Sequence, residues 1–445
     1  MAGVTLRKPS MVDVHYHIER PGPRARYIIP HLIGRMAGWE AREVVSLEEF
    51  RSVEGPKLIY GEAAVDGAFR VVPQDLLENT ELKTAEPVVV VEEGLPRLFP
   101  SGRGDLPFDL FAGAFFLLSR MEEYGDLPRD RHGRPVMARL HAARHGYLQR
   151  PVVDEWLTLL AGAWRTADPA LPPMQRRYGH TATMDVDNGA MYLGREWWRS
   201  AGGAARDLLK GRFRRVAHRL AVIAGKKPDP YAVHQRFLDM AEAHGARAIV
   251  NFMAAGRGVH DHALPLAGDH MRAVVRSVAA RAEVGLHPGY HSSDIPANIA
   301  GEKQLLESVV GRPVTCSRQH FLRMRVPDTL RALDGLGIRE EHSMGMSDSI
   351  GFRASTCTPF PFYDLGREQA LPLIMHPFAV MDSTLAYQMR LGPAGAVAAA
   401  KRMVDAVRAV NGTFISVWHE RFLSGYGDEA GWGGVAGEVL QYARP

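Results

Sequence analysis

Cysteine is scarce in this sequence, since only Cys316 and Cys357 occur among 445 residues. The scarcity excludes a disulfide-stapled scaffold, and a chain of this length can bury a sufficient core without one. We therefore interpret both cysteines as ordinary thiols. Long apolar runs are also missing, because no stretch reaches the roughly 18 residues of a membrane-spanning helix. Residues 1–20 lack the apolar segment of a secretory leader, so we expect a globular protein of the cytoplasm.

A strong excess of one charge sign is absent as well. The net charge is only +4 with 23% charged and 46% apolar residues, which excludes a disordered chain and does not indicate a polyanion binder. One segment departs from this balance: residues 195–227, from Arg195 to Lys227, hold ten Lys or Arg against two acidic residues. This segment fits a helix that meets a membrane surface or an anionic substrate, or simply a solvated helical face. A nucleic-acid-binding protein is the weakest alternative, and no nucleic acid is expected as a partner.

The chain divides into two parts near residue 175, where the proline-rich segment 168–173 precedes a change of pattern. Residues 1–175 predict a smaller α/β accessory domain, with strands at 57–60 and 87–91 and a helix at 108–121. Residues 176–445 alternate short β-like runs with helical runs at 269–282, 302–310, 328–336 and 394–410. Seven strands are predicted, at 181–185, 248–253, 283–287, 313–316, 338–343, 371–375 and 413–418. This alternation predicts an α/β fold of the distorted (β/α)7 barrel type.

Polar side chains cluster directly after the predicted strands. In a β/α barrel all such strand ends open onto one face, where active sites are built. Residues far apart in the sequence are therefore expected to converge there. The candidates are Asp185, Asp187, His287, His291, Arg318, His320, Asp348, His419 and Glu420.

Asp185 and Asp187 lie two residues apart at the end of the first predicted strand and are followed by Gly189. One carboxylate can bind a metal while its neighbour moves protons, provided that their surroundings separate the two pKa values. The alternative is an Asx-turn that carries two solvated aspartates.

His287 and His291 are four residues apart directly after a strand, and with one carboxylate they would make an open zinc-type site. Roughly one pair with this spacing is expected by chance among 19 histidines, and His141 with His145 is a second instance. That second pair has no preceding strand and no aspartate pair nearby, so we interpret it as a feature of a surface helix.

Arg318 and His419 are two further residues that could function in such a site. Arg318 could orient an aspartate through a bidentate pair, and His419 could donate a proton to a leaving group. A surface salt bridge and a capped core histidine are the alternatives. The occurrence of all these groups after successive strands favours the functional interpretation.

The order of these residues resembles the polysaccharide deacetylase family, also called the NodB-homology group or carbohydrate esterase family 4. In place of that family's T-F-D-D-G segment stands the run from Thr183 to Gly189, which implies that Asp185 is the catalytic base and Asp187 a metal ligand. The family's H-[S/T]-x-x-H pair implies His287 and His291 as the other two ligands, with Pro288 at the hydroxyl position.

The resemblance also assigns roles nearer the C-terminus. Ser317-Arg318-Gln319-His320 stands where the family has its arginine segment, without the usual proline, and implies that Arg318 orients the base; Phe352-Arg353 is a rival match. Asp348 corresponds to the acidic segment after the fifth strand. The closing L-x-H motif corresponds to Val417-Trp418-His419, which implies that His419 is the general acid.

Together these motifs imply a metal-dependent hydrolase that removes an N-acetyl group from an amino sugar or an anionic glycan precursor. Zinc is the first choice of divalent metal, and nickel, cobalt or manganese would also suit the donors. The largest departure is Val186 between the two aspartates, which would turn the second carboxylate to another face if the strand continues. A catalytically inactive, carbohydrate-binding member of the same fold is therefore the alternative. The N-terminal part resembles an accessory domain found before divergent members.

Overall fold

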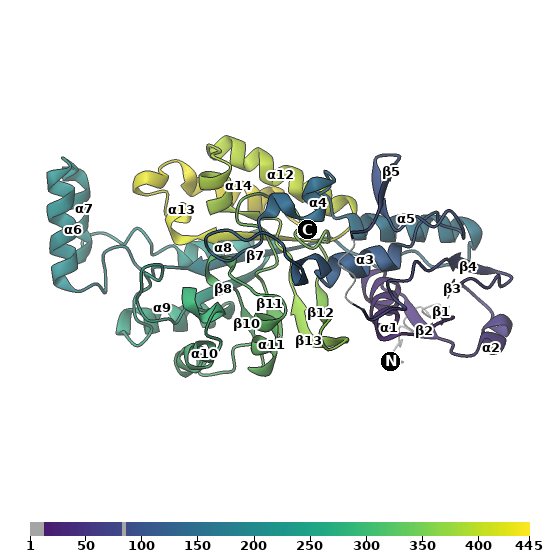
Figure 1. Ribbon diagram of the computed structural model, residues 1–445. Helices are drawn as coiled ribbons and strands as arrows, with labels where there is room; N and C mark the ends of the chain where they lie inside the picture. Colours follow the sequence, from purple (N-terminus) through teal and green to yellow (C-terminus); the bar gives the residue numbers. More distant parts are fainter. Residues whose placement is uncertain (1–12, 82–85) are drawn as a thin grey trace, which may run out of the picture.

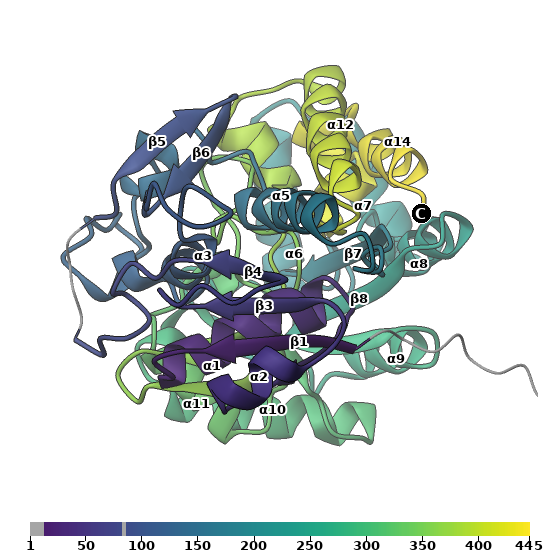
Figure 2. The ribbon, with the colours of Figure 1, turned by 90° about the vertical axis from the view of Figure 1, so that its right-hand side faces the viewer.

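The computed structural model describes residues 13–81 and 86–445. The N-terminal unit, residues 13–175, is built on a parallel sheet with strand order β2-β1-β3-β4, and a separate antiparallel ribbon joins β5 to β6 (Figures 1 and 2). The predicted strand at 57–60 is present as β3, and the strand predicted at 87–91 is present as β5. The strands are β1 (Asp13–Ile18), β2 (Glu40–Glu43), β3 (Lys57–Tyr60), β4 (Ala68–Val71), β5 (Val89–Glu92) and β6 (Leu95–Leu98).

Helices cover both faces of this parallel sheet, which explains why every residue of β3 is buried. Ile59 packs towards Phe50 of α2 on one face, and Leu58 and Tyr60 join the main core on the other. The helix predicted at 108–121 is present as α3 and is entirely buried. The helices of this unit are α1 (Pro23–Pro30), α2 (Leu47–Ser52), α3 (Leu110–Leu118), α4 (His141–Arg144) and α5 (Val152–Ala167).

The C-terminal unit contains a nine-stranded sheet of order β12-β13-β11-β10-β9-β8-β7-β15-β14. All neighbours pair in parallel except β12 and β13. Each of the seven predicted strands is present, whereas β12 and β14 were not predicted. The strands are β7 (Gly179–Val186), β8 (Arg247–Met253), β9 (Glu283–His287), β10 (Cys316–Ser317), β11 (Glu340–Glu341), β12 (Phe360–Asp364), β13 (Gln369–Met375), β14 (Val380–Met381) and β15 (Thr413–His419).

The predicted barrel is not confirmed, because no closed sheet is present in residues 13–81 and 86–445. At one edge, the antiparallel strand β12 replaces the parallel partner that closure would require. This edge lies against the N-terminal unit, where the Tyr27 hydroxyl donates to the carbonyl of Pro361 at 2.6 Å. At the other edge β14 has only two residues, Val380 and Met381. A closing strand would have to displace the N-terminal unit, so the α/β sheet stays open.

Helices flank the C-terminal sheet, and the four that were predicted are present as α9 to α12. The pair α6 and α7 stands apart from the rest of the molecule, at the end opposite the N-terminal unit (Figure 1). No helix in the described part of the chain has both the length and the apolar character needed to cross a bilayer. The helices are α6 (Trp197–Leu209), α7 (Phe213–Ile223), α8 (His234–Ala243), α9 (Asp269–Ala279), α10 (Ala297–Val310), α11 (Asp328–Gly335), α12 (Pro393–Ala409), α13 (Glu420–Ser424) and α14 (Val435–Tyr442).

The two units share one apolar core, whose buried side chains run from Val14 to Ala443. Buried ion pairs also cross between them. The Glu123 carboxylate accepts from Arg353 at 2.6 Å and from Arg120 at 2.9 Å, and all three side chains are buried. Arg353, the rival match to the family's arginine, therefore joins the two units and does not reach Asp185.

Candidate active site

The register of the sheet brings three polar residues side by side at the carboxyl ends of the strands. Asp185 in β7 lies opposite Asn251 in β8 and opposite His419 in β15. The Asn251 amide donates to Asp185 Oδ1 at 2.8 Å. Gly285 in β9 leaves room for that amide, because a Cβ at this position would collide with Asn251 Oδ1. The local sequence of three neighbouring strands thus fixes one oxygen of Asp185.

Val186 does not separate the two aspartates as the sequence suggested. Side chains alternate along a strand, so Val186 turns into the apolar core while Asp185 and Asp187 both line one cavity. The turn after the strand is held by Glu420, which accepts from the backbone N–H groups of Asn188 at 3.0 Å and Gly189 at 2.8 Å. This turn sets the position of the Asp187 carboxylate.

Asp187, His287 and His320 form a group with the donor set of a divalent-metal site. One ligand atom from each lies within 4.8 Å of the others. Asp187 Oδ1 is 3.4 Å from His287 Nε2 and 3.8 Å from His320 Nε2. That oxygen is buried and has no hydrogen-bond partner in the described residues, which is costly for a carboxylate unless a cation binds it. The residues therefore fit a metal ion held by one carboxylate and two imidazoles.

Both imidazoles are oriented by a second oxygen behind them. His287 Nδ1 donates to the Arg318 carbonyl at 2.6 Å, and His320 Nδ1 donates to Asp261 Oδ1 at 2.8 Å. Because a carbonyl and a carboxylate can only accept, each Nε2 is left with its lone pair directed at Asp187. This arrangement is typical of metal-binding histidines, whose outer partners fix the tautomer.

His291, predicted as the third ligand, is not part of this group, and His320 takes its place. The chain turns sharply after β9, since Asp261 accepts from the Tyr290 N–H at 3.0 Å and Glu302 accepts from the Gly289 N–H at 3.0 Å. The His291 side chain is exposed as a result. His320 follows the fourth predicted strand in the sequence, and this position at a strand end was the signal that could have identified it as a ligand.

Arg318 lies beside Asp185, as the resemblance implied, with Nη1 3.6 Å from Asp185 Oδ2. Its guanidinium is fully buried near the Phe378 ring, and Nε, Nη1 and Nη2 have no hydrogen-bond partner in residues 13–81 and 86–445. Burial raises the pKa of Asp185, but the positive charge of Arg318 and the neighbouring histidines outweigh it and hold that pKa below its usual value. Asp185 is therefore ionised at neutral pH, as a general base must be.

His419 is fixed from behind by Asp382, a residue that sequence reasoning did not select. His419 Nδ1 donates to Asp382 Oδ1 at 2.6 Å, and the His419 N–H donates to Oδ2 at 2.7 Å. Burial lowers the pKa of His419, but the Asp382 charge and hydrogen bond outweigh it and raise this pKa to about 9. The signal that was missed is an aspartate directly after the two-residue strand β14.

Asp348 is not brought together with the central residues. It is exposed and lines the same cavity, but no hydrogen bond or ion pair joins it to Asp185, Asp187 or His419 within the part of the chain that the structure describes. Asp348 thus lies at the rim of the cavity, and the aspartate that contacts His419 is Asp382.

Two other groups noted in the sequence lie elsewhere. His141 does not lie on a surface helix, because it is buried in the N-terminal unit and hydrogen bonds to the hydroxyl of Tyr147. Cys316 lies with Glu340 and His342 in a second cluster of potential ligand atoms. There Arg247 already binds Glu340 at 2.9 Å, so the carboxylate is neutralised without a metal.

Two cavities meet at the metal-binding group. One has a volume of about 620 Å³ and is walled by both units: Asp130, Arg131, His132 and Arg134 come from the N-terminal unit. The other, of about 400 Å³, is lined by Arg215 of α7 and by the loop 426–429. Asp187, His320, Phe321 and Arg421 line both. An elongated substrate therefore has room on each side of the candidate metal position.

Comparison with known families concerns the N-terminal unit. Residues 14–169 match a family described as a family of unknown function (DUF7033). Among curated proteins, none matches this sequence.

Among solved structures, the protein is similar to two that carry the name polysaccharide deacetylase and to one CE4 family pseudoenzyme. One, from Mycobacterium smegmatis and classed as a polysaccharide deacetylase, has 16% identity and a TM-score of 0.38, covering 60% of this chain and 86% of that one. The polysaccharide deacetylase Bc1974 from Bacillus cereus has 10% identity and a TM-score of 0.30, covering 60% and 87%. A mutant of a CE4 family pseudoenzyme with restored enzymatic activity has 12% identity and a TM-score of 0.29, covering 60% and 64%.

Proposed function

We propose that the C-terminal unit is a divalent-metal-dependent hydrolase that removes an acyl group from the nitrogen of an amino sugar. The observation that carries the proposal is the group Asp187, His287 and His320, whose free carboxylate oxygen faces two imidazole nitrogens of fixed tautomer. Asp185 and His419 flank this group from adjacent strands. The motif resemblance implies the same roles for Asp185, Asp187, His287 and His419, but it names His291 where this proposal has His320.

The ligand set would hold zinc, nickel, cobalt or manganese, with zinc the first choice for two imidazoles and a carboxylate. When bound, such an ion would lower the pKa of a water molecule and polarise the acyl carbonyl. The third ligand in this proposal is His320, since His291 is exposed.

The chain's own residues would divide the proton transfers between them. Asp185 would accept the proton of the attacking water, and Asn251 and Arg318 would hold its two oxygens in place. His419 would donate a proton to the nitrogen as the C–N bond breaks, with Asp382 stabilising the imidazolium before that step. The products would be a free carboxylate and an amine on the sugar. The base and the acid thus lie on neighbouring strands. The pKa of Asp185 is lowered, which keeps the base ionised, and the pKa of His419 is raised, which keeps the acid protonated.

The wall of the larger cavity supports an anionic amino sugar or glycan precursor as the substrate class. Three guanidinium groups line that wall, from Arg131, Arg134 and Arg421. Asp130 neutralises Arg134 at 2.6 Å, and Arg421 lies 3.4 Å from Asp187 Oδ2. Arg131 is therefore the guanidinium left to meet a phosphate or carboxylate on the substrate.

Metal analysis of the purified protein and of matched variants tests the ligand set first. We expect about one divalent ion per chain, and a loss of most of it in His287→Ala and His320→Ala. His291→Ala is the control, and it should keep its metal because that side chain points into solvent. Retention of metal by His320→Ala with loss in His291→Ala would overturn the proposed site.

Activity is tested by acetate release from N-acetylated sugars, including phosphorylated ones. Asp185→Asn should retain metal and lose activity by about 10²–10⁴-fold, because it removes the base and leaves the ligands. If the metal-loaded protein binds such sugars but releases no acetate, it is the catalytically inactive carbohydrate-binding alternative.

A further inference from the structure

The helices α6 and α7 form a hairpin whose apolar side faces outward. Half of the exposed large apolar residues in the described chain, seven of fourteen, lie in this hairpin. Leu209 is 89% exposed and Trp197 80% exposed. On α6 the outward residues share one face at helical spacing, namely Trp197, Trp198, Ala201, Ala205, Leu208 and Leu209. On α7 they are Phe213, Ala217, Leu220 and Ile223.

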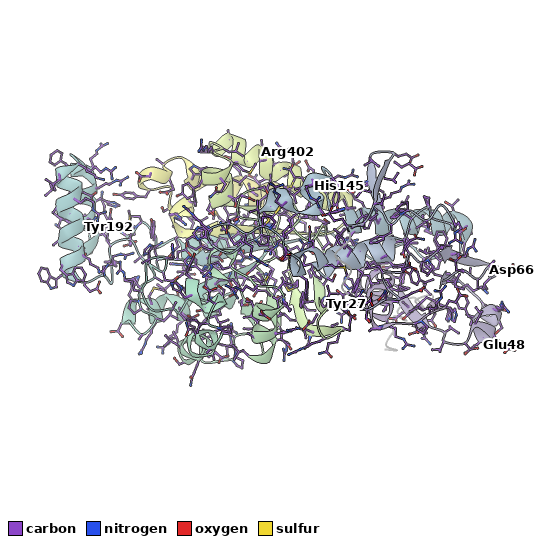
Figure 3. All side chains as sticks on the ribbon, viewed as in Figure 1. Tyr27, Glu48, Asp66, His145, Tyr192 and Arg402 are labelled. Carbon is purple, nitrogen blue, oxygen red and sulfur yellow. The ribbon has the colours of Figure 1, made fainter. Side chains whose placement is uncertain are left out.

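Polar contacts on the inner side hold this orientation. Asp207 of α6 is buried and accepts from Arg219 of α7 at 2.9 Å. Arg219 also lies over the ring of Tyr192, 4.7 Å from its centroid, on the side of the hairpin that faces the rest of the molecule (Figure 3). Gly203 makes room for the Arg219 guanidinium, because a Cβ there would collide with it. Rotating the apolar faces inward would break this buried ion pair, so they stay outward.

Exposed cationic side chains lie in the same two helices as the exposed apolar faces and in the segments that flank them. Segment 195–227 has ten Lys or Arg and two acidic residues, of which Asp207 is buried and Glu196 pairs with Arg199 at 3.2 Å. The exposed cations are Arg206, Lys210, Arg212, Arg214, Lys226 and Lys227. The outer surface therefore combines tryptophan, leucine and phenylalanine with an unneutralised positive charge, a composition suited to the boundary between lipid headgroups and acyl chains.

We propose that the α6–α7 hairpin docks the protein on the surface of an anionic phospholipid bilayer. The cations meet the lipid phosphates, and the apolar faces of both helices enter the headgroup region without crossing the membrane. A second copy of the chain fits this surface poorly, because pairing two hairpins would bring two cationic rims together. The docking does not depend on the proposed hydrolase activity.

Docking would also place one cavity near the lipid. Arg215 of α7 pairs with Asp428 at 2.7 Å, and both line the smaller cavity, which shares Asp187 and His320 with the candidate metal site. If the proposed function holds, this cavity would receive an amino sugar carried on a lipid phosphate from the docked surface.

Vesicle co-sedimentation of the full-length protein tests the docking. The probes are vesicles of phosphatidylcholine alone and of phosphatidylcholine with about 30% phosphatidylglycerol, at low and high salt. We expect at least about tenfold tighter binding to the anionic vesicles, weakened by salt. Trp197→Ser with Leu209→Ser should weaken binding at least about tenfold, and so should Arg212→Glu with Arg214→Glu.

Matched control variants distinguish docking through the hairpin from nonspecific adsorption to vesicles. Val45→Ser with Val91→Ser removes two exposed apolar groups from the N-terminal unit. Arg165→Glu with Arg402→Glu reverses two exposed charges elsewhere (Arg402 is labelled in Figure 3). Both controls should bind as the parent does, and circular dichroism should show all variants folded. The proposal is overturned if the parent does not bind anionic vesicles, or if the controls lose as much vesicle binding as the hairpin variants. It is also overturned if the hairpin substitutions leave vesicle binding unchanged and convert a dimer to a monomer.

Discussion

Three histidines of the candidate site have Nδ1 bound by an oxygen that can only accept. For His287 and His320 this leaves Nε2 free to bind a metal, and for His419 it leaves Nε2 free to carry a proton. A carboxylate lies behind both His419 and His320, but only the pKa of His419 is raised. At His320 burial outweighs the hydrogen bond to Asp261 and lowers the pKa of the ring. The same side chain thus serves two purposes according to its surroundings.

The pair His419 and Asp382 predicts where activity falls at alkaline pH. The pKa of His419 is raised to about 9, so the protonated form that donates to the leaving amine persists until the pH rises through that value. Asp382→Asn removes the largest cause of the increase. We expect the alkaline limb of the pH–rate profile to move to lower pH by roughly one unit or more.

Asp348→Asn is the control for this profile, because Asp348 lines the cavity rim and does not touch His419. It should leave the alkaline limb in place. An alkaline limb that is the same in Asp382→Asn and the parent would remove His419 from the role of general acid.

At the scale of elements, the sequence identified the strands of the C-terminal sheet as short runs with few charged residues. They have this composition because nearly every position of β7, β8, β9 and β15 is buried. It did not reveal β14, whose two residues carry no periodicity, and so Asp382 was missed. It placed Asp185, Arg318 and His419 at strand ends, where the structure also has them. The choice between His291 and His320 depends on the turn after β9, which is held by Asp261 and Glu302 from other segments.

The barrel prediction is not confirmed, and the reason lies in contacts with the N-terminal unit that the sequence of the C-terminal unit does not reveal. The N-terminal unit contacts edge strand β12 through Tyr27 and Pro361, and it contacts the turn between β12 and β13 through Arg24 and Glu368 at 2.7 Å. Hydrophobic periodicity reports which residues of a strand are buried, but not whether the first and last strands pair.

The contact between elements of the two units predicts a pH-dependent stability. Burial raises the pKa of Glu123, but Arg353 and Arg120 outweigh it and lower the pKa to about 2, against 4.5 for the ordinary group. Because the folded pKa is depressed, this stabilisation is fully present above pH 4.5 and is lost as the pH falls towards 2. Glu123→Gln should lower the free energy of unfolding by about 3–5 kcal/mol at neutral pH, because the buried Arg353 loses its counter-charge and the buried Arg120 keeps only Glu122.

Urea denaturation at pH 7 and below pH 4.5 measures this effect, and the gap between variant and parent should narrow at the lower pH. Glu62→Gln is the matched control, since the Glu62 to Arg103 pair is exposed. It should cost less than about 1 kcal/mol. A pH-independent gap for Glu123→Gln would mean that lost packing, not lost charge, destabilises the variant.

At the scale of the whole molecule, the N-terminal unit takes part in the candidate site and does not merely precede it. Its loop at 130–134 lines the larger cavity together with Met381 and Tyr387 of the C-terminal unit. The loop is anchored across the boundary, because the Arg323 guanidinium donates to the His132 carbonyl at 2.8 Å and His132 hydrogen bonds to the Tyr290 hydroxyl at 2.9 Å. The N-terminal unit can therefore influence which substrate reaches Asp187.

Arg131 is the residue of that loop through which we expect the influence to act. It is exposed in the cavity wall and forms no ion pair with a carboxylate in residues 13–81 and 86–445, so its charge is available to a substrate phosphate or carboxylate. Arg131→Ala should raise KM for an anionic N-acetylated sugar roughly tenfold while kcat changes less than about twofold, because the lost contact binds substrate and transition state alike. For a neutral N-acetylated sugar, Arg131→Ala should have the same KM and kcat as the parent. Arg129→Ala is the matched control, since Arg129 is an exposed arginine directly before that loop and does not line the cavity. Equal losses for neutral and anionic sugars would show that Arg131 supports the loop's shape and does not select substrates by charge.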